Sequence, residues 1–377
     1  MNRQAVAQSG RSAAGTRMKS TSPNAAEHRI CHINLAGGFR GGERQTELLV
    51  RELAARNWRQ RLVVRSGGAL VKRCKDVPGL EITEVLAHPI TAAIAGRGCS
   101  VVHAHEARAV YSGWLLQRMA KTPYVLTRRI DHAAGSSLPR TSAYRSASKV
   151  VAISSSIART VEAHYPDIEC EVVPDAHADM LNGYANGAGR RKSTDKTTGK
   201  TVVGHIGELD HSHKGQGTII EAARAMKDSH PNLHFVLVGN GKDDRKFRRT
   251  ASGLGNVEFV GFVDNVADYL ATFDVFIYPS LREGLGSSLL DAMHFGLPIV
   301  ASEVGGIPEI VEHQVNGLLI PPASPRELIA AIERVVADAG LRESMRQHNR
   351  NKAAQFGAAR MATSYESIYR SILNGAH

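Results

Sequence analysis

The chain lacks any run of 18 apolar residues, so by the usual length criterion we expect no membrane-spanning helix. Aromatic residues make up only 5% of the sequence, which is too few for the stacking rings of a nucleic-acid-binding surface. The four cysteines are far apart and show no paired metal-ligand spacing. We therefore expect a protein of a reducing compartment whose cysteines pack as small hydrophobic side chains.

The first 26 residues contain basic and small residues but no acidic residue and no apolar segment, which rules out a secretory signal. We expect residues 1–28 to form a disordered basic tail. An organelle transit peptide has a similar composition, and that alternative stays open. The expected location is the cytoplasm, either free or peripheral at the inner face of the cytoplasmic membrane.

Acidic residues are scarce in the first half of the chain. Residues 1–180 carry a net charge of +10, whereas residues 181–377 carry +1. A basic surface of this kind attracts anionic membranes, phosphorylated glycolipids or nucleic acids. Because the charges are dispersed and aromatics are few, we exclude nucleic acid as a partner and retain an anionic membrane surface.

Segments typical of buried strands alternate with segments of helical spacing from Arg29 onward. The alternation predicts parallel sheets covered by helices. The polar residues 181–200 have no periodicity and predict a linker. We therefore expect an α/β chain of two doubly wound domains, residues 29–180 and 201–355, with ligands bound in the cleft that their strand ends face. Strands are expected at QRLVV, SVVHAH, PYVLT, KVVAIS and CEVVP in the first domain, and at TVVGHIG, HFVLVGN, VEFVG, DVFIYPS, PIVAS and GLLIPP in the second.

The stretch EGLGSSLLDAMHFGLPIVAS places two carboxylates, Glu283 and Asp291, around a Gly/Ser turn. A helix is predicted to begin near Gly286 and to end at Gly296, before a buried strand. The free N–H groups and the positive dipole end at such a helix N-terminus favour an anion. An N-capped helix with two solvated acids is the alternative that this stretch alone leaves open.

This stretch, followed by GGIPEIV and NGLLIPP and combined with GGER near the start and HKG in the middle, resembles the signature of the retaining GT-B glycosyltransferases of family 4 (glycosyltransferase group 1). The resemblance covers the chain from about residue 29. It implies a GT-B fold with an N-terminal acceptor-side domain, a C-terminal nucleotide-sugar-binding domain, and residues 356–377 as a helix that packs back on the N-terminal domain. The family usually has a second Glu where this chain has Asp291.

Several residues receive roles from this resemblance. Glu283, His105 and Lys214 are expected to be catalytic: Glu283 holds donor-sugar hydroxyls, His105 lies beside the transferred sugar, and Lys214 neutralises the diphosphate. The family often has Arg where this chain has Glu208, so we expect Lys214 to work with another cation, Arg282 or Arg40, or to be oriented by Glu208. The remaining donor-binding candidates are Gly41, Gly42, Phe262, Val263, Gly286, Ser287, Ser288, Leu289 and Asp291, the last of these for the ribose.

Arg128 and Arg129 follow a strand and are predicted to hold an acidic acceptor, with a surface salt-bridge role as the alternative. The spacing of His103 with His105, and of His211 with His213, allows a metal site, but no further ligands complete one. We therefore expect no cofactor and a metal-independent enzyme.

The predicted function is retaining transfer of a sugar from a nucleotide-sugar to a saccharide or lipid-linked acceptor. We expect a UDP-sugar, because UDP is the commonest carrier in the family that the chain resembles. The expected pathway is cell-envelope polysaccharide or lipopolysaccharide biosynthesis. Two alternatives stay open: a sugar-nucleotide epimerase of similar architecture, and a non-catalytic nucleotide-sugar-binding subunit. The departures at Glu208 and Asp291 motivate the second alternative.

Overall fold

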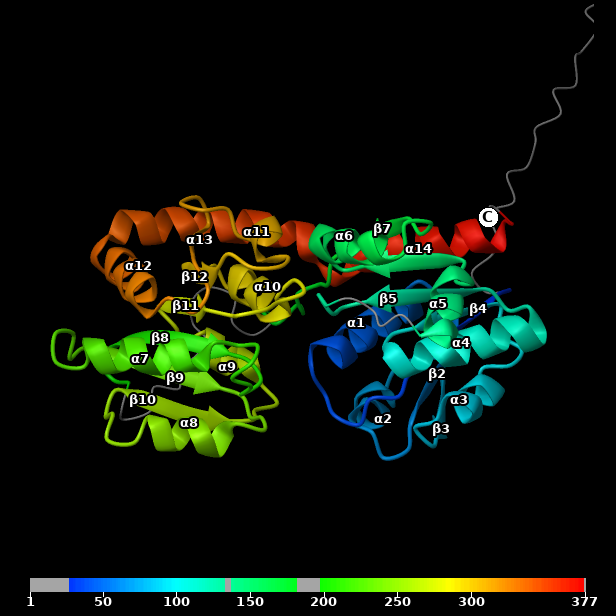
Figure 1. Cartoon of the computed structure of the whole chain (residues 1–377), viewed down its shortest axis with the longest axis horizontal. Coiled ribbons are helices and arrows are strands. Elements are labelled where there is room, and N and C mark those ends of the chain that lie inside the picture. The colour runs from blue at the N-terminus through cyan, green and yellow to red at the C-terminus, as the bar shows by residue number, and fades with distance from the viewer. Residues whose placement is uncertain (1–26, 133–136, 182–196, 376–377) are drawn as a thin grey trace, which may run out of the picture.

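The computed structural model describes residues 27–132, 137–181 and 197–375. Most of the predicted tail and most of the predicted linker lie outside these residues. The described chain forms two units side by side, each built on a parallel β-sheet with packed helices (Figure 1). The helix α14 leaves the second unit and returns to the first.

The first sheet has seven strands in the order β3-β2-β1-β4-β5-β6-β7, and the second has six in the order β10-β9-β8-β11-β12-β13. In each sheet the order reverses beside the first strand of the unit, and ligands bind at such a switch point in doubly wound folds. The strands are β1 (Arg29–Asn34), β2 (Arg59–Arg65), β3 (Leu80–Val85), β4 (Val101–Ala104), β5 (Tyr124–Arg128), β6 (Lys149–Ala152), β7 (Cys170–Val172), β8 (Thr201–Ile206), β9 (Leu233–Val238), β10 (Val257–Gly261), β11 (Val275–Tyr278), β12 (Ile299–Ser302) and β13 (Gly317–Ile320).

The helices cover these sheets and connect their strands. In chain order they are α1 (Gly41–Ala55), α2 (Ala69–Cys74), α3 (Pro89–Ala95), α4 (Ala107–Ala120), α5 (Leu138–Arg145), α6 (Ser155–His164), α7 (Gln216–Met226), α8 (Asp244–Thr250), α9 (Val266–Leu270), α10 (Ser287–His294), α11 (Ile307–Ile310), α12 (Pro325–Ala337), α13 (Ala339–Ala353), the short 3-10 turn Ala354–Phe356 and α14 (Ala358–Leu373). Among the described residues, none of the helices combines the length and the apolar character that crossing a bilayer requires.

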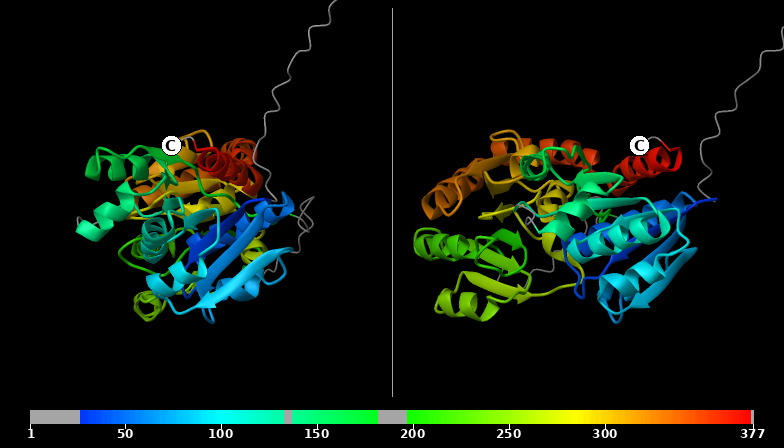
Figure 2. Two further views of the ribbon diagram at one scale, coloured as in Figure 1. Left: turned by 90° about the vertical axis from the view of Figure 1, so that its right-hand side faces the viewer. Right: turned by 45° about the vertical axis from the view of Figure 1, so that its right-hand side comes forward.

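Helix α14 packs against α1 and β4 of the first unit. In Figures 1 and 2 this red helix lies along the blue and cyan unit. Tyr365 and Tyr369 of α14 are buried in a core cluster with Ile30 and Leu49 of the first unit. The chain leaves the first unit near His177 and returns to it after Phe356. These two connecting segments contact each other, because the His177 N–H donates to the Phe356 carbonyl at 2.9 Å. The C-terminal segment therefore ties the second unit to the first.

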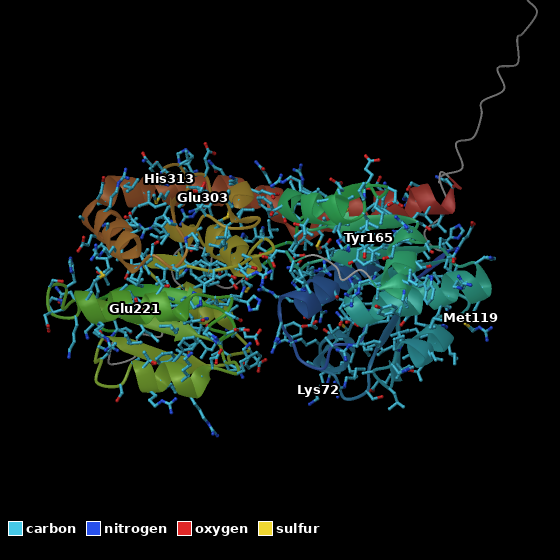
Figure 3. All side chains as sticks on the ribbon, in the orientation of Figure 1. Lys72, Met119, Tyr165, Glu221, Glu303 and His313 are labelled. Carbon is cyan, nitrogen blue, oxygen red and sulfur yellow. The ribbon has the colours of Figure 1, made fainter. Side chains whose placement is uncertain are left out.

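The loop-helix-strand prediction for residues 283–302 is confirmed. Helix α10 begins after Gly286, which has a φ of 99°, and ends before Gly296, which has a φ of 69°. Both backbone conformations suit glycine and are strained for other residues. Side chains fill both units, as Figure 3 shows, with Lys72 on α2 of the first and Glu221 on α7 of the second among those labelled.

Candidate active site

A cavity of about 740 Å³ lies between the two units. The first unit lines it with the loop before α1 and with part of α1, including Gly41 and Gly42. The second unit lines it with the ends of β8, β9 and β11 and with the first turn of α10. The strand ends of a doubly wound sheet therefore contribute to the cavity, as the fold predicts.

Lys214, Glu283 and Tyr278 form one hydrogen-bonded cluster on the cavity wall. The Lys214 Nζ donates to Glu283 Oε2 at 2.5 Å and to the Tyr278 hydroxyl at 2.9 Å. The Tyr278 hydroxyl in turn donates to Glu283 Oε2 at 2.8 Å. The sequence predicted Lys214 and Glu283 as site residues but missed Tyr278, whose only signal was its place at the end of a predicted strand.

The charges of this pair stabilise each other. Burial acts to lower the pKa of Lys214, but the attraction of Glu283 and then of Tyr278 outweighs burial, and the pKa lies above its ordinary value. Burial acts to raise the pKa of Glu283, but the charge of Lys214 and its hydrogen bond outweigh burial, and this pKa is lowered. Both side chains are therefore ionised at neutral pH, and together they carry no net charge.

Two helix N-termini meet at the cavity. A Cβ atom at Gly41, the first residue of α1, would lie 3.0 Å from the Ser287 Oγ, at the start of α10. Leu289 was predicted to bind the sugar donor through its N–H. This N–H instead donates to the Gly286 carbonyl at 2.9 Å, within the first turn of the helix. Ser287 and Ser288 line the cavity, and their position in the first helical turn leaves their N–H groups without intrahelical partners. Their amides are thus placed to receive an anion.

Asp291 is directed at the first unit rather than into the cavity. Its oxygens accept two hydrogen bonds from the Arg44 guanidinium, at 2.5 and 3.0 Å, and one from the Ala178 N–H at 3.3 Å. The Asp291 side chain is only 4% exposed, whereas Arg44 lines the cavity. The predicted ribose ligand is therefore half of an ion pair that joins the two units.

Glu208 pairs with Arg40 and not with Lys214. The Arg40 Nη2 lies 2.8 Å from Glu208 Oε1, and both residues line the cavity from opposite units. Arg282, the other cation suggested by the sequence, lies 3.5 Å from Asp131 and does not line the cavity. Of the three arrangements that the sequence left open, the structure therefore brings Arg40 to the site.

Of the two arginines predicted to bind the acceptor, Arg129 lines the cavity and Arg128 does not. Arg129 lines the cavity, and its guanidinium bonds Asp175 at 3.2 Å and the His105 carbonyl at 3.2 Å. Burial raises the pKa of Asp175 in spite of the charge of Arg129. Arg128 instead donates to the Ile130 carbonyl within its own loop and does not line the cavity. Asp175 lines the cavity and was missed by the sequence.

His105 lies in the core of the first unit. It is 2% exposed, and its Nε2 lies 3.0 Å from Nδ1 of His32. The neighbouring His103 bonds the Tyr369 hydroxyl at 2.6 Å and the Thr127 Oγ1 at 2.7 Å. Burial, with smaller contributions from the two other histidines, lowers the pKa of His105 well below its ordinary value. The imidazole is thus neutral, and it does not line the cavity that holds Glu283.

Two groups of side chains bring metal-ligating atoms close together: His32 with His103 and His105, and Asp210 with His211 and Asp243. In the first group both ring nitrogens of His103 already have partners. In the second, Asp210 accepts from the Ser212 N–H and pairs with Lys242 at 3.0 Å. The expectation that the protein needs no metal stays a prediction.

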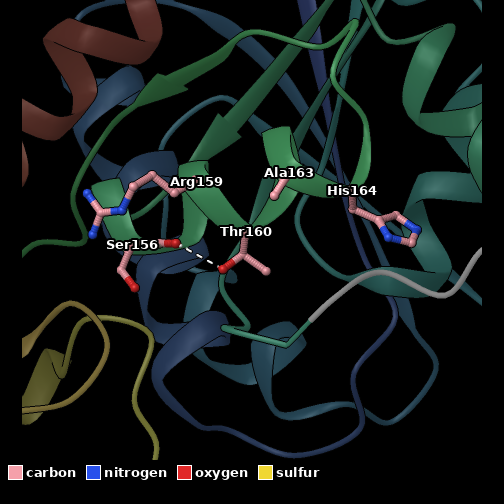
Figure 4. Close-up of a pocket in the computed structure, with 5 residues that line it drawn as sticks. All are labelled: Ser156, Arg159, Thr160, Ala163 and His164. Carbon is pink, nitrogen blue, oxygen red and sulfur yellow. Dashed lines mark hydrogen bonds between the residues drawn. The ribbon is translucent and has the colours of Figure 1, made fainter.

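The two residues predicted to contact the base, Phe262 and Val263, line the cavity, and Phe262 is 53% exposed. A second depression lies on the outer surface of α6, where Figure 4 shows Ser156, Arg159 and Thr160 with an internal hydrogen bond. It is a shallow surface feature without a buried polar group, so the cavity between the units is the better candidate.

Residues 200–338 match the family described as glycosyl transferases group 1. An uncharacterized glycosyltransferase of Methanocaldococcus jannaschii is 27% identical over 266 residues, which cover 64% of this chain and 67% of that protein. The D-inositol 3-phosphate glycosyltransferase of Corynebacterium aurimucosum is 28% identical over 309 residues, covering 73% and 72%. Other relatives are matched over a third to a half of their length.

The fold is also that of solved structures. The crystal structure of Anabaena Alr3699/HepE in complex with UDP-glucose has a TM-score of 0.79 to this chain at 21% identity, covering 91% of this chain and all of that one. The predicted α/β GT-B architecture is thereby confirmed. The family match and the named relatives support the prediction that this protein is a glycosyltransferase. Residues 200–338 of this GT-B chain form a domain of the glycosyl transferases group 1 family.

Proposed function

We propose that this protein transfers a sugar from a UDP-sugar to a saccharide or lipid-linked acceptor, with retention at the anomeric carbon. The observation that carries the proposal is the cavity in which the Lys214–Glu283–Tyr278 cluster faces the N-terminal turns of α1 and α10. Amides and an ammonium suit a diphosphate, and a carboxylate beside them suits sugar hydroxyls. The crystal structures of Anabaena Alr3699/HepE in complex with UDP and with UDP-glucose support the choice of carrier.

The chemical demand is to stabilise negative charge on the leaving diphosphate. The bond from the anomeric carbon to the β-phosphate oxygen breaks, and a bond from that carbon to the acceptor oxygen forms on the same face. The acceptor proton passes to the leaving phosphate. Lys214 and the amides of Ser287 and Ser288 stabilise the phosphate charge, while Glu283 holds hydroxyls of the sugar as positive charge develops on its ring.

The other site residues receive supporting roles in this proposal. Phe262 and Val263 contact the base, and Gly42 allows the diphosphate to approach the start of α1. The ribose meets the Arg44–Asp291 pair through Arg44, the member that lines the cavity. Arg129 holds an acidic group of the acceptor, and Arg128 supports its loop. His105 helps to position Arg129, because the Arg129 guanidinium donates a hydrogen bond to the His105 carbonyl.

We place the reaction in cell-envelope polysaccharide synthesis. The amylovoran biosynthesis glycosyltransferase AmsK of Erwinia amylovora, 36% identical over 134 residues that cover 32% of this chain and 33% of that protein, supports this class of product. The basic first half would bring the protein to an anionic membrane. Binding to vesicles with and without anionic lipid tests this point, and binding that is insensitive to salt would contradict it.

The direct test is donor hydrolysis and transfer measured with UDP-sugars and a panel of saccharide acceptors, with and without a metal chelator. Transfer that persists with the chelator is the expected result. An epimerase would produce a new sugar nucleotide from the donor alone. A non-catalytic binding subunit would bind UDP without any turnover.

A further inference from the structure

The cations of the cavity are not equally available to a new anion. Six cationic side chains of the described residues line it. Five of them are paired with carboxylates, and the side chains of these five cations are themselves between 12% and 38% exposed: Arg44, Arg51, Arg73, Arg129 and Lys214. Arg40 differs, because its side chain is 69% exposed in its pair with Glu208. A solvated ion pair contributes little stability, so Arg40 exchanges its partner at the lowest cost among these described cations.

The backbone on each side of this pair is fixed while the side chains are not. The Arg40 N–H donates to the Glu43 Oε2 at 2.9 Å, which holds the loop at the start of α1. The Glu208 carbonyl accepts from the buried Gln216 amide at 2.8 Å. A change of partner by Arg40 therefore requires side-chain rotation and no movement of either unit.

A diphosphate in this cavity needs more positive charge than Lys214 supplies. The charge of Lys214 is neutralised by Glu283, whose Oε2 lies 2.5 Å from the Lys214 Nζ. This pair therefore offers the diphosphate a hydrogen-bond donor but no net charge. The helix N-termini add only partial charges. Arg40 is the residue directly before the first turn of α1, and this turn faces α10. Its guanidinium can bind two phosphate oxygens at once.

We propose that Arg40 is a donor-binding residue that leaves Glu208 to bind the diphosphate. The first unit thereby supplies a guanidinium, whereas the described residues of the second unit bring only the paired Lys214 to the cavity as a cation. Glu208 holds the guanidinium over the cavity until the nucleotide arrives, and its side chain, 29% exposed, then turns to solvent. This inference rests on the proposed function, because it requires a nucleoside diphosphate in the cavity.

The test is the affinity for UDP, measured by calorimetry, in wild type and three variants. Arg40→Ala is expected to weaken UDP binding on the order of tenfold, as the loss of one charge-assisted contact predicts. Glu208→Arg placed on the Arg40→Ala background is expected to restore affinity to within about twofold to threefold of wild type, because it returns a guanidinium to the same cavity from the other unit.

The double variant separates this role from a structural one. Both Arg40→Ala and the double variant lack the Arg40–Glu208 pair, so a purely structural effect would leave the two equally weak. Arg145→Ala is the matched control, since it breaks another exposed ion pair, Arg145–Asp167 at 2.7 Å, and Arg145 does not line the cavity. This variant is expected to bind UDP within about twofold of wild type.

Wild-type affinity in Arg40→Ala, or no recovery in the double variant, overturns the inference while the proposed function stands. If wild type binds none of UDP, GDP and ADP, the proposed function itself is overturned, and the inference with it. Unfolding midpoints without nucleotide, equal in all variants within a few degrees, are the expected evidence that the variants fold.

Discussion

His105 and Glu283 occupy comparable places in the two units, yet their surroundings differ. Each follows a strand at the end where doubly wound folds bind ligands, and each was predicted to be catalytic. The His105 imidazole packs among histidines in the core, whereas the Glu283 carboxylate meets Lys214 on the cavity wall. The comparison teaches that position after a strand fixes where the backbone lies, and that neighbouring partners decide where the side chain points.

The largest expected effect is that of Glu283→Gln. The amide keeps the size of the side chain but removes the charge that would hold the sugar at the transition state, so turnover should fall about a hundredfold. UDP affinity should change less than about threefold, because the diphosphate contacts are made by other groups. Steady-state kinetics and calorimetry on one preparation measure both quantities.

The control for this variant is Glu309→Gln. Glu309 accepts from the Ser155 and Ser156 N–H groups at 2.8 Å, away from the cavity, so its loss should affect stability and not turnover. Equal turnover in wild type and Glu283→Gln would remove Glu283 from the chemistry and break the comparison.

Asp291→Ala should have the next largest effect, on stability. It leaves the half-buried Arg44 guanidinium without its carboxylate partner between the units, at a cost of about 1–3 kcal/mol in the free energy of unfolding. Asp291→Asn, which retains an acceptor, should cost less. Denaturant unfolding measures both, and an unchanged midpoint in Asp291→Ala would show that the two units are held together without this pair.

Tyr369→Phe tests whether the buried histidine network around His105 contributes to stability or to turnover. It removes the hydroxyl that lies 2.6 Å from the His103 Nδ1 in the buried histidine network, so about 1 kcal/mol of stability should be lost. Turnover per folded molecule should change less than about threefold, since the network does not line the cavity. A loss of turnover as large as that of Glu283→Gln would mean that the histidines take part in the chemistry after all.

The smallest expected effect concerns pH. Because the pKa of Glu283 is lowered in the folded protein, its contribution to stability is present above about pH 4.5 and is lost as the pH falls through the folded value. The raised pKa of Lys214 gives a contribution that is present below about pH 10.5 and lost only above it. The difference in unfolding free energy between wild type and Glu283→Gln should therefore be flat from about pH 6 to 9.

Much of the fold was predictable because buried parallel strands are continuous apolar runs. The segments DVFIYPS and PIVAS predicted β11 and β12 for this reason. Strand β3 was missed, because Glu81 and Glu84 interrupt its apolar residues and it lies at the sheet edge. An edge strand buries less of its surface, and its sequence signal is correspondingly weaker.

The site was predictable where one segment carries it and not where distant segments meet. Glu283 and the turn of α10 were recognisable within a single stretch. The partners of Asp291 and Glu208, which are Arg44 and Arg40, lie far away in sequence and belong to the other unit. No local pattern encodes such pairs, so the roles of the two carboxylates as partners of arginines required the structure.

The central claim is that the diphosphate binds where the first turns of α1 and α10 meet beside Lys214. A crystal structure of the protein soaked with UDP tests it most directly. The account predicts phosphate oxygens within hydrogen-bond distance of the Ser287 or Ser288 amides and of the Lys214 ammonium. UDP bound at any other place, with this cavity left to solvent, would contradict it.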